Sequence, residues 1–228
     1  MFNKLNIFSI SVLLPTKNRP YDLVNALNSI LMQTRLPAEL VIVDQSVDES
    51  SVRAVQNIMS QFNSVNLTYI HDAKILGLVD AKRVAVNNAS GDLICFLEDD
   101  IVLEADYIRQ IELGFIKQPT MMGCSGVITH PPKVGILYKF FFKIFHRGIF
   151  EDNRINMHGK YSGDNNNLKQ SNMISGGVSA WRREVFDNVE FDVSNEFHMF
   201  EDIDFSTRVA FHFGNRLFIN QNARLAHY

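Results

Sequence analysis

Cysteine is scarce in this chain, with two among 228 residues, Cys95 and Cys124. No C-x-x-C spacing occurs, so the pattern offers neither a disulfide framework nor a zinc-binding pair. Cys95 falls inside an apolar run that is typical of a strand. We therefore interpret it as a buried core thiol rather than as a disulfide partner or a metal ligand.

Long apolar runs and an excess of positive charge are also missing. No stretch approaches the roughly 18 apolar residues that indicate a transmembrane helix. The formal net charge is −3, which does not suggest bulk affinity for nucleic acid. A lysine precedes the first apolar stretch, as in a signal peptide, but no small-x-small cleavage site follows it. We therefore interpret residues 7–14 as a buried strand and not as a targeting segment.

Strand-like and helix-like segments alternate through the first hundred residues. The expected strands cover residues 7–14, 40–43, 65–72 and 92–100, and the expected helices cover residues 21–34, 51–62 and 80–90. We expect Asp22 to cap the first helix and the third helix to stop near Gly91. This order implies crossover connections and a mostly parallel sheet covered on both faces, so the predicted fold class is α/β.

The second half of the chain is less regular. Residues 162–172 are interpreted as a polar loop, and residues 173–186 as a strand, a glycine pair and the start of a helix. Residues 201–214 predict a helix that ends at Gly214, and residues 216–228 predict one or two short strands. Residues 137–150 are aromatic and basic. They could lie on an anionic membrane surface or pack on the core, and the sequence leaves both open.

Polar segments follow three of the expected strands: "PTKNR", "DQS" and "EDD". Ligands of parallel sheets bind beyond the carboxyl ends of the strands, so we expect these segments to lie side by side. Three neighbouring carboxylates suit a hard divalent cation. Acidic residues after a strand are also common as helix caps or solvated loop tips, and the segment alone does not decide between these interpretations.

Together, these segments could hold a nucleoside diphosphate. Arg19, Lys82 and Arg83 could offset the charge of the phosphates, and Asp44 could accept a hydrogen bond from a nucleobase N–H. A metal ion between the carboxylates and the diphosphate would neutralise the leaving group as a bond breaks.

A second carboxylate cluster, formed by Glu201, Asp202 and Asp204, opens the late helix. Acidic residues stabilise a helix N-terminus, which is one explanation for the cluster. The other is a general base within hydrogen-bond reach of an acceptor hydroxyl. His227, near the end of the chain, is either structural or a complement to "EDD" at a site for Mn²⁺.

The order and spacing of these motifs resemble those of the family 2 glycosyltransferases, which have the GT-A fold. The resemblance runs from about residue 9 to residue 228. It is carried by "SVLLPTKNRP", "ELVIVDQSVDES", "GLVDAKRVAVNNASGDLICFLEDDI", "GGVSAWRREVFD", "FEDIDFSTRV" and "ARLAH". It implies a Rossmann-like, mostly parallel central sheet flanked by helices, with an irregular acceptor-side half. The chain would be one domain, with residues 7–101 binding the nucleotide and residues 102–228 binding the acceptor and carrying catalysis. Family members usually continue past the late histidine, which leaves truncation at the C-terminus open.

The resemblance also implies an activity. This is the inverting transfer of a sugar from a nucleotide sugar, commonly a UDP-sugar, to a hydroxyl of a glycan or lipid-linked glycan, with Mn²⁺ or Mg²⁺. The implied roles are metal binding by Asp100 and His227; nucleotide binding by Pro15, Thr16, Asn18, Arg19, Asp44, Ser46, Lys82, Arg83, Glu98 and Asp99; acceptor binding by Glu201, Gly176 and Gly177; and base catalysis by Asp202. By family analogy the setting is bacterial polysaccharide or glycolipid assembly, in the cytoplasm or peripherally at the inner face of the membrane.

The chain departs from the family pattern at three points. Lys82 and Arg83 follow Ala81 where the family often has Ala-Arg-Asn, Glu98 stands in place of the first Asp of the DxD-type motif, and "QSVDES" follows Asp44.

Two other hypotheses stay open. A metal-dependent sugar nucleotidyltransferase also places acidic residues at strand ends, but it would need a glycine-rich phosphate loop, and "PTKNRP" has no glycine. A non-catalytic module that binds nucleotide sugars is disfavoured by the presence of "EDD", the Glu-Asp pair and His227.

Overall fold

The computed structural model describes residues 8–62, 64–129, 167–193 and 200–228. Its strands are β1 (Ile10–Thr16), β2 (Glu39–Asp44), β3 (Asn66–His71), β4 (Leu93–Leu97), β5 (Ile101–Leu103), β6 (Gly123–Ile128), β7 (Leu168–Ser171), β8 (Val178–Arg182) and β9 (Leu217–His227). Its helices are α1 (Pro20–Leu31), α2 (Ser50–Met59), α3 (Gly77–Asn87), α4 (Tyr107–Lys117) and α6 (Glu201–Phe213), with a 3₁₀ turn, η3 (Arg183–Val185).

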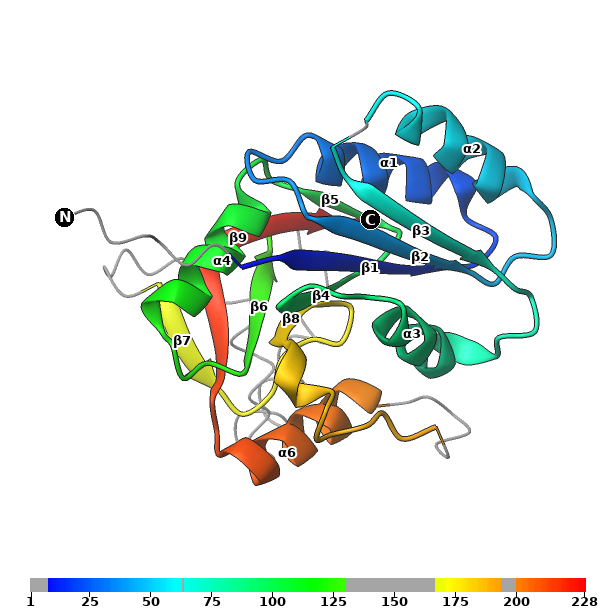
Figure 1. Ribbon diagram of the computed structural model, residues 1–228. Coiled ribbons are helices and arrows are strands. Elements are labelled where there is room, and N and C mark those ends of the chain that lie inside the picture. The colour runs from blue at the N-terminus through cyan, green and yellow to red at the C-terminus, as the bar shows by residue number, and fades with distance from the viewer. Residues whose placement is uncertain (1–7, 63, 130–166, 194–199) are drawn as a thin grey trace, which may run out of the picture.

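The strands form one nine-stranded sheet in the order β3-β2-β1-β4-β8-β6-β9-β5, and β7 pairs with β9 (Figure 1). The pairings among β3, β2, β1 and β4 are all parallel, as the sequence predicted. In the second half, β8 runs antiparallel to β4 and β6, and β9 runs parallel to β6 but antiparallel to β5 and β7. The α/β class is therefore confirmed, and the sheet is mixed where the chain pattern was irregular.

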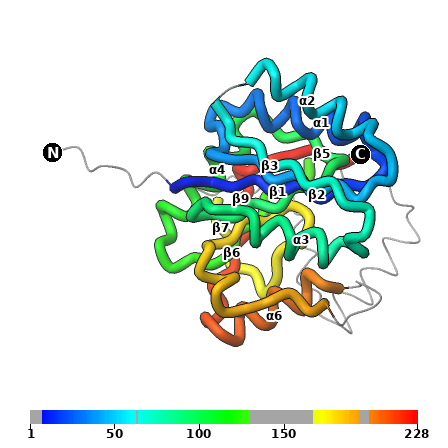
Figure 2. Tube along the Cα trace, turned by 45° about the vertical axis from the view of Figure 1, so that its right-hand side comes forward, coloured from blue at the N-terminus to red at the C-terminus, as the bar shows by residue number. Residues whose placement is uncertain are grey.

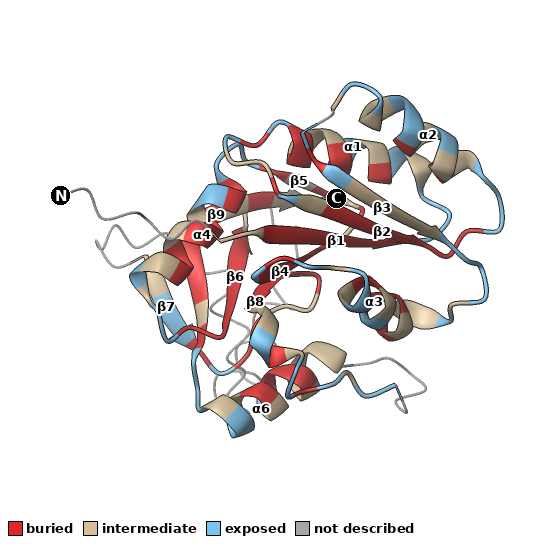
Figure 3. Cartoon of the chain, viewed as in Figure 1, coloured by how far each residue is buried: buried red, intermediate tan, exposed pale blue. Residues whose placement is uncertain are grey.

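Helices cover both faces of the parallel strands. In both ribbon and tube views, α1 and α2 lie on one side of the sheet, and α3 and α6 lie on the other (Figures 1 and 2). Side chains alternate along β1, so Leu14 packs in the same core cluster as Leu27 of α1. Leu13 packs instead with Ala85 of α3 and Phe205 of α6. β1 is buried along its length (Figure 3), which confirms a buried strand at this position.

Two predicted helix boundaries are wrong. The residue that precedes α1 is Arg19, Pro20 opens the helix, and Asp22 lies inside the first turn without capping it. A proline suits this place because its missing N–H would be unpaired there anyway. The third helix begins at Gly77 and ends at Asn87, before Gly91. Gly91 instead packs against β1, where a Cβ atom would overlap the backbone and side chain of Ser11.

The second half holds more regular structure than its sequence suggested. Part of the predicted polar loop forms β7, an edge strand that pairs with β9 and has Lys169 and Gln170 exposed. β8 follows the glycine pair instead of preceding it, and a single 3₁₀ turn replaces the expected helix start. β5, α4 and β6 were not predicted. The helix ending at Gly214 is confirmed, and β9 is one long strand.

Expectations for the cysteines, for membrane-spanning helices and for residues 137–150 can also be compared with the structure. Both cysteines are free and buried, and burial raises the pKa of each thiol to about 12, as expected of core residues. In the part of the chain that the structure describes, no helix is long and apolar enough to cross a membrane. The basic, aromatic stretch at 137–150 lies outside the described residues.

Candidate active site

The acidic turn and the late histidine meet because two strands pair. Glu98, Asp99 and Asp100 connect β4 to β5, and β5 then runs antiparallel to β9. The register places Ile101 opposite His227, and the Tyr228 amide donates a hydrogen bond to the Asp100 carbonyl. A residue at the end of the chain is thereby held beside a turn more than a hundred positions earlier.

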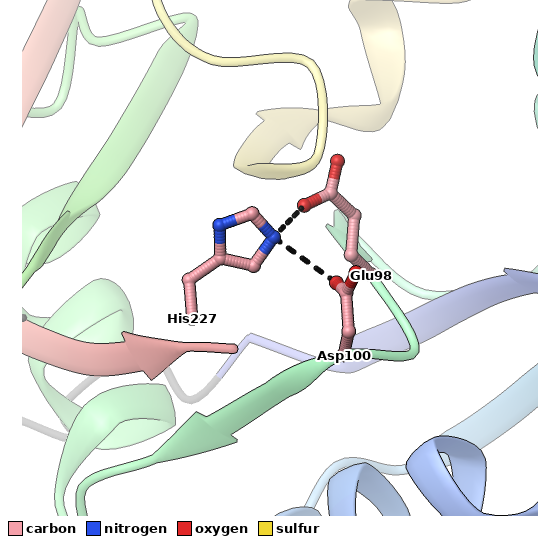
Figure 4. A group of neighbouring side chains, drawn as sticks. All are labelled: Glu98, Asp100 and His227. Carbon is pink, nitrogen blue, oxygen red and sulfur yellow. Dashed lines mark hydrogen bonds and ion pairs between the residues drawn. The ribbon is translucent and has the colours of Figure 1, made fainter. Parts of the chain in front are cut away.

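Three side chains at this place converge on one point. The Nε2 atom of His227 lies 3.1 Å from Asp100 Oδ1 and 3.2 Å from Glu98 Oε2 (Figure 4). One ligand atom of each residue lies within 4.8 Å of the others. Two carboxylates and an imidazole form a donor set that suits Mn²⁺ and also tolerates Mg²⁺. The residues present therefore fit a divalent cation.

Asp99 faces the other way, toward the end of β1. Its side chain is almost fully buried and accepts a hydrogen bond of 2.7 Å from the Thr16 hydroxyl. One guanidinium nitrogen of Arg19 lies 3.2 Å from Asp99 and 2.7 Å from Asp100. Arg19 thus balances two of the three carboxylates and links the first loop to the acidic turn.

The electrostatics of the turn reflect its crowding. Burial raises the pKa of Glu98, and the repulsion from Asp100 adds to this effect, while the His227 ring opposes it. Burial also raises the pKa of Asp99, against the hydrogen bond from Thr16 and the charge of Arg19. Added positive charge at this turn would relieve the repulsion between its carboxylates.

A pocket of about 540 Å³ opens over the turn. It is lined by Pro15, Thr16, Lys17, Arg19, Gln45, Leu78, Glu98, Asp99, Asp100 and His227. These residues come from the carboxyl ends of β1, β2 and β4, the start of α3 and the end of β9. Seven of the predicted nucleotide or metal residues contribute directly, and the sequence missed Lys17, Gln45 and Leu78.

Asp44 does not line this pocket. It is fully buried, its Oδ2 atom accepts 2.7 Å from the Tyr69 hydroxyl, and its Oδ1 atom accepts 2.9 Å from the Ser46 amide. The Ser46 hydroxyl in turn accepts from the amide of Asn18, which adopts a left-handed conformation with φ 58°. These hydrogen bonds join the loop that follows β1 to the loop that follows β2, through Asn18, Ser46 and Asp44.

The neighbouring Gln45 does face the pocket. Its side-chain nitrogen donates 2.8 Å to the Ile75 carbonyl and 3.0 Å to the Gly77 carbonyl. Both donors of the amide are directed at backbone, so the orientation of the group is fixed. The oxygen is the part of this side chain that a ligand could contact. Its place next to Asp44 at a strand end was the sequence signal that could have revealed it.

Neither of the two basic residues of α3 lines this pocket, although the charge of Lys82 acts on Glu98 and opposes the rise in the pKa of that carboxyl. Lys82 is 2% exposed and pairs with Glu201 of α6, with its nitrogen 2.5 Å from Oε1. Arg83 is exposed and pairs with Asp80 on its own helix. The buried side of α3 also carries Val79 and Ala85, at spacings of three residues from Lys82. This period marks Lys82 as a core-facing position, a signal that was present in the sequence.

The second carboxylate pair stands at the start of α6. Glu201 Oε2 accepts 2.9 Å from the Asp202 amide, and Asp202 Oδ1 accepts 2.9 Å from the Ile203 amide. The helix is anchored by Phe205, whose ring stacks on Phe191 with 4.4 Å between centroids. The start of α6 is therefore fixed against the core of the second half.

The glycine pair lies between the two carboxylate groups. A Cβ atom on Gly177 would overlap the side chain of Glu98, and one on Gly176 would overlap Glu201 and crowd Lys82 and Asp202. The short segment that leads into β8 therefore lies between two groups of side chains. One is the candidate metal-binding group of Glu98, Asp100 and His227, and the other is the pair of carboxylates at the start of α6. Only glycine allows both to approach it so closely.

The fold places the molecule in a known class. The structure matches the mannosyltransferase PcManGT from Pyrobaculum calidifontis, solved with GDP-Man and Mn²⁺, at a TM-score of 0.68 and 17% identity over 97% of this chain and 57% of that one. It matches GalNAc-T7, solved with UDP, GalNAc and Mn²⁺, at a TM-score of 0.74 and 15% identity over 97% of this chain and 43% of that one. The fold is that of the GT-A glycosyltransferases.

Sequence comparison identifies the family. Residues 11–190 match the family described as glycosyl transferase family 2, and the chain belongs to that family. It is 24% identical over 189 residues to glycosyltransferase GlyA of Streptococcus pneumoniae serotype 4, covering 81% of this chain and 26% of that protein. It is 25% identical over 202 residues to the uncharacterized glycosyltransferase YwdF of Bacillus subtilis, covering 88% of this chain and 68% of that protein. The chain thus spans about a quarter of GlyA and about two thirds of YwdF.

Proposed function

We propose that this chain transfers a sugar, with inversion, from a nucleoside diphosphate sugar to a hydroxyl group of a glycan or lipid-linked glycan. One observation carries the proposal. The glycine pair brings the group of Glu98, Asp100 and His227 close to the carboxylates at the start of α6. The first group suits a charged leaving group and the second suits an acceptor proton. Each is of limited use to a glycosyl transfer without the other.

The pocket over the acidic turn would hold the donor. Asp100, His227 and Glu98 would hold a Mn²⁺ or Mg²⁺ ion, whose positive charge would stabilise the diphosphate leaving group. Arg19 already contacts two of the carboxylates and could turn one donor toward a phosphate oxygen. Lys17 lines the same pocket and adds a second positive charge from the first loop.

The nucleobase would contact the loop that follows β2. The predicted contact, Asp44, is fully buried, and both of its oxygens accept hydrogen bonds from the protein, so we assign Asp44 to holding this loop. The fixed oxygen of Gln45 is then the acceptor for a base N–H. A uracil N3–H is a donor of this kind, as is the N1–H of guanine, whereas cytosine has an acceptor at N3. Between the two, the resemblance to the family favours a UDP-sugar as the donor.

Asp202 would act as the general base. Its carboxylate takes the proton from the acceptor hydroxyl while that oxygen forms a bond to the anomeric carbon. The bond between the anomeric carbon and the diphosphate oxygen breaks on the opposite face, and its electron pair leaves with the nucleoside diphosphate. One displacement of this kind inverts the anomeric centre.

A panel of nucleotide sugars incubated with Mn²⁺ tests the proposal. We expect hydrolysis or transfer with at least one UDP-sugar, release of UDP, and dependence on the metal. NMR of the first-formed product would show the anomeric configuration opposite to that of the donor. Formation of a nucleotide sugar from a nucleoside triphosphate would indicate a nucleotidyltransferase instead. Binding of UDP-sugars without any turnover across the panel would indicate a non-catalytic module.

The predicted contact with a membrane surface stays a prediction. It concerns residues 137–150, and it would place the enzyme at the inner face of a bacterial membrane near a lipid-linked acceptor. Flotation with vesicles that contain anionic lipid, compared with neutral vesicles, would reveal such binding. Absence of the protein from both floating fractions would contradict the membrane contact and leave the proposed transfer reaction untouched.

A further inference from the structure

The pair formed by Lys82 and Glu201 joins distant parts of the molecule. Lys82 lies on α3, which covers the parallel strands, and Glu201 is the first residue of α6, 119 positions later. Their charged atoms are 2.5 Å apart, and the Lys82 side chain is almost fully buried. The Lys82 nitrogen also lies 5.7 Å from the ring centre of Phe96. The ion pair is thus largely buried, with 2% of the Lys82 side chain and 16% of the Glu201 side chain exposed.

A lysine at this position is energetically costly. Removing an ammonium group from water costs several kcal/mol, and the gain from a partner repays it only when the geometry is good. A methionine of similar volume would pack among the neighbours of α3 without that cost. The pair is therefore better explained by what it holds in place than by stability.

Glu201 has both of its oxygens occupied. One accepts from Lys82 and the other accepts from the Asp202 amide. The preceding residue, Phe200, has φ 60° and provides no side-chain cap for α6. The Glu201 carboxylate thus takes the place of a cap, and Lys82 fixes where that carboxylate lies.

We propose that Lys82 is a positioning residue, which holds Glu201 as a strut and thereby sets the direction of Asp202. The inference rests on the proposed function for the role of Asp202. It removes Lys82 from the set of donor-binding residues and Glu201 from the set that binds the acceptor. Gly176 belongs to the same unit, because a side chain there would separate Lys82 from Glu201.

Four variants test the strut: Lys82→Met, Glu201→Gln, the double variant Lys82→Met with Glu201→Gln, and the control Lys117→Met. Lys117 is an exposed lysine in the last turn of α4, so its replacement should leave kcat and melting temperature near those of wild type. Each single variant leaves one charged group without an opposite charge beside it and should melt at a lower temperature. The double variant removes both charges and should regain most of the lost stability.

The kinetics distinguish positioning from other roles. We expect kcat to fall on the order of 100-fold in Lys82→Met and to stay low in the double variant, because a small misplacement of the base is costly. The Kd for UDP with Mn²⁺, measured by calorimetry, should stay within about twofold. A large loss of UDP affinity in Lys82→Met would make Lys82 a donor ligand and overturn the proposal. Recovery of kcat together with stability in the double variant would also overturn it.

A readout without turnover separates this proposal from the proposed function. The Asp202 amide is bonded to Glu201, so its hydrogen exchange, followed by NMR, should be slow in wild type and faster in Lys82→Met. Unchanged protection of this amide would contradict the strut whether or not the enzyme turns over. An inactive wild type with the expected exchange pattern would count against the proposed function alone.

Discussion

Gly177 lies directly against the carboxylate of Glu98, in the space where any other residue would carry its Cβ atom. The overlap would involve the far end of a flexible side chain and not backbone. A larger residue at position 177 should therefore displace Glu98 without preventing the fold from forming. Gly177 is therefore required for Glu98 to lie beside Asp100 and His227.

The variant Gly177→Ala tests this relation. We expect Mn²⁺-dependent binding of UDP to weaken by about tenfold or more, because a displaced ligand lowers metal affinity. The melting temperature should change by only a few degrees. Calorimetry with and without Mn²⁺ measures the first effect and thermal unfolding the second. The control is Gly114→Ala on α4, where the nearest atom to the added Cβ is 3.2 Å away. Equal UDP affinity in the two variants would show that Glu98 need not lie where the structure has it.

Asp100 contacts both His227 and Arg19, so its charge is central to the acidic turn. Asp100→Asn keeps the size of the side chain and removes that charge. We expect affinity for Mn²⁺ in the presence of UDP to fall by about 10–100-fold. Asp80→Asn is the matched control, because Asp80 pairs with Arg83 on the surface of α3, where an ion pair contributes little. A Mn²⁺ titration that does not change in Asp100→Asn would remove Asp100 from the metal-binding set.

Asp202→Asn should separate donor binding from chemistry. The amide cannot accept the proton of the acceptor, so we expect kcat to fall by about 10²–10⁴-fold with the Kd for UDP unchanged. Asp204→Asn is a control from the same turn, since Asp204 is partly exposed and pairs with Arg208. Its transfer rate should stay near that of wild type. Near-normal turnover by Asp202→Asn would exclude Asp202 as the base.

The parallel half of the fold could be predicted from sequence because its signals are local. β1, β2 and β4 are continuous apolar runs, and α1 repeats its apolar residues at helical spacing. β6 has two glycines and a serine among six residues, and β7 is mostly polar. Both are strands because of their partners β8 and β9, and no local pattern could reveal that.

Some features of the site could likewise be predicted from local sequence, and others could not. The acidic turn was visible as charge after a strand, whereas its meeting with His227 depends on the pairing of β5 with β9. That pairing joins segments too distant for periodicity to connect, and it was not predicted. The residues alone left the role of His227 open between structure and metal binding, and the resemblance to a family implied metal binding. Charge alone suggested that Lys82 would face a phosphate. The helical phase of α3 puts it in the core instead, opposite Glu201.

The hydrogen bonds between Ser9, just before β1, and Asp92, just before β4, predict how the stability of the fold depends on pH. Asp92, just before β4, accepts hydrogen bonds of 2.7 Å and 2.8 Å from the hydroxyl and the amide of Ser9, and these bonds lower its pKa. A lowered pKa in the folded state means that the contribution to stability is present above the unfolded value of about 4 and is lost as the pH falls below it.

Asp92→Asn should therefore unfold more easily than wild type at pH 7, by about 1 kcal/mol because the site is exposed. The difference should shrink as the pH falls through the lowered pKa of Asp92 in the folded protein, because the wild-type side chain is then protonated as well. Urea unfolding at several pH values measures it, with Asp187→Asn, another exposed aspartate, as the control. A deficit that does not shrink at any acidic pH at which wild type is still folded would mean that the charge of Asp92 does not strengthen its bonds to Ser9.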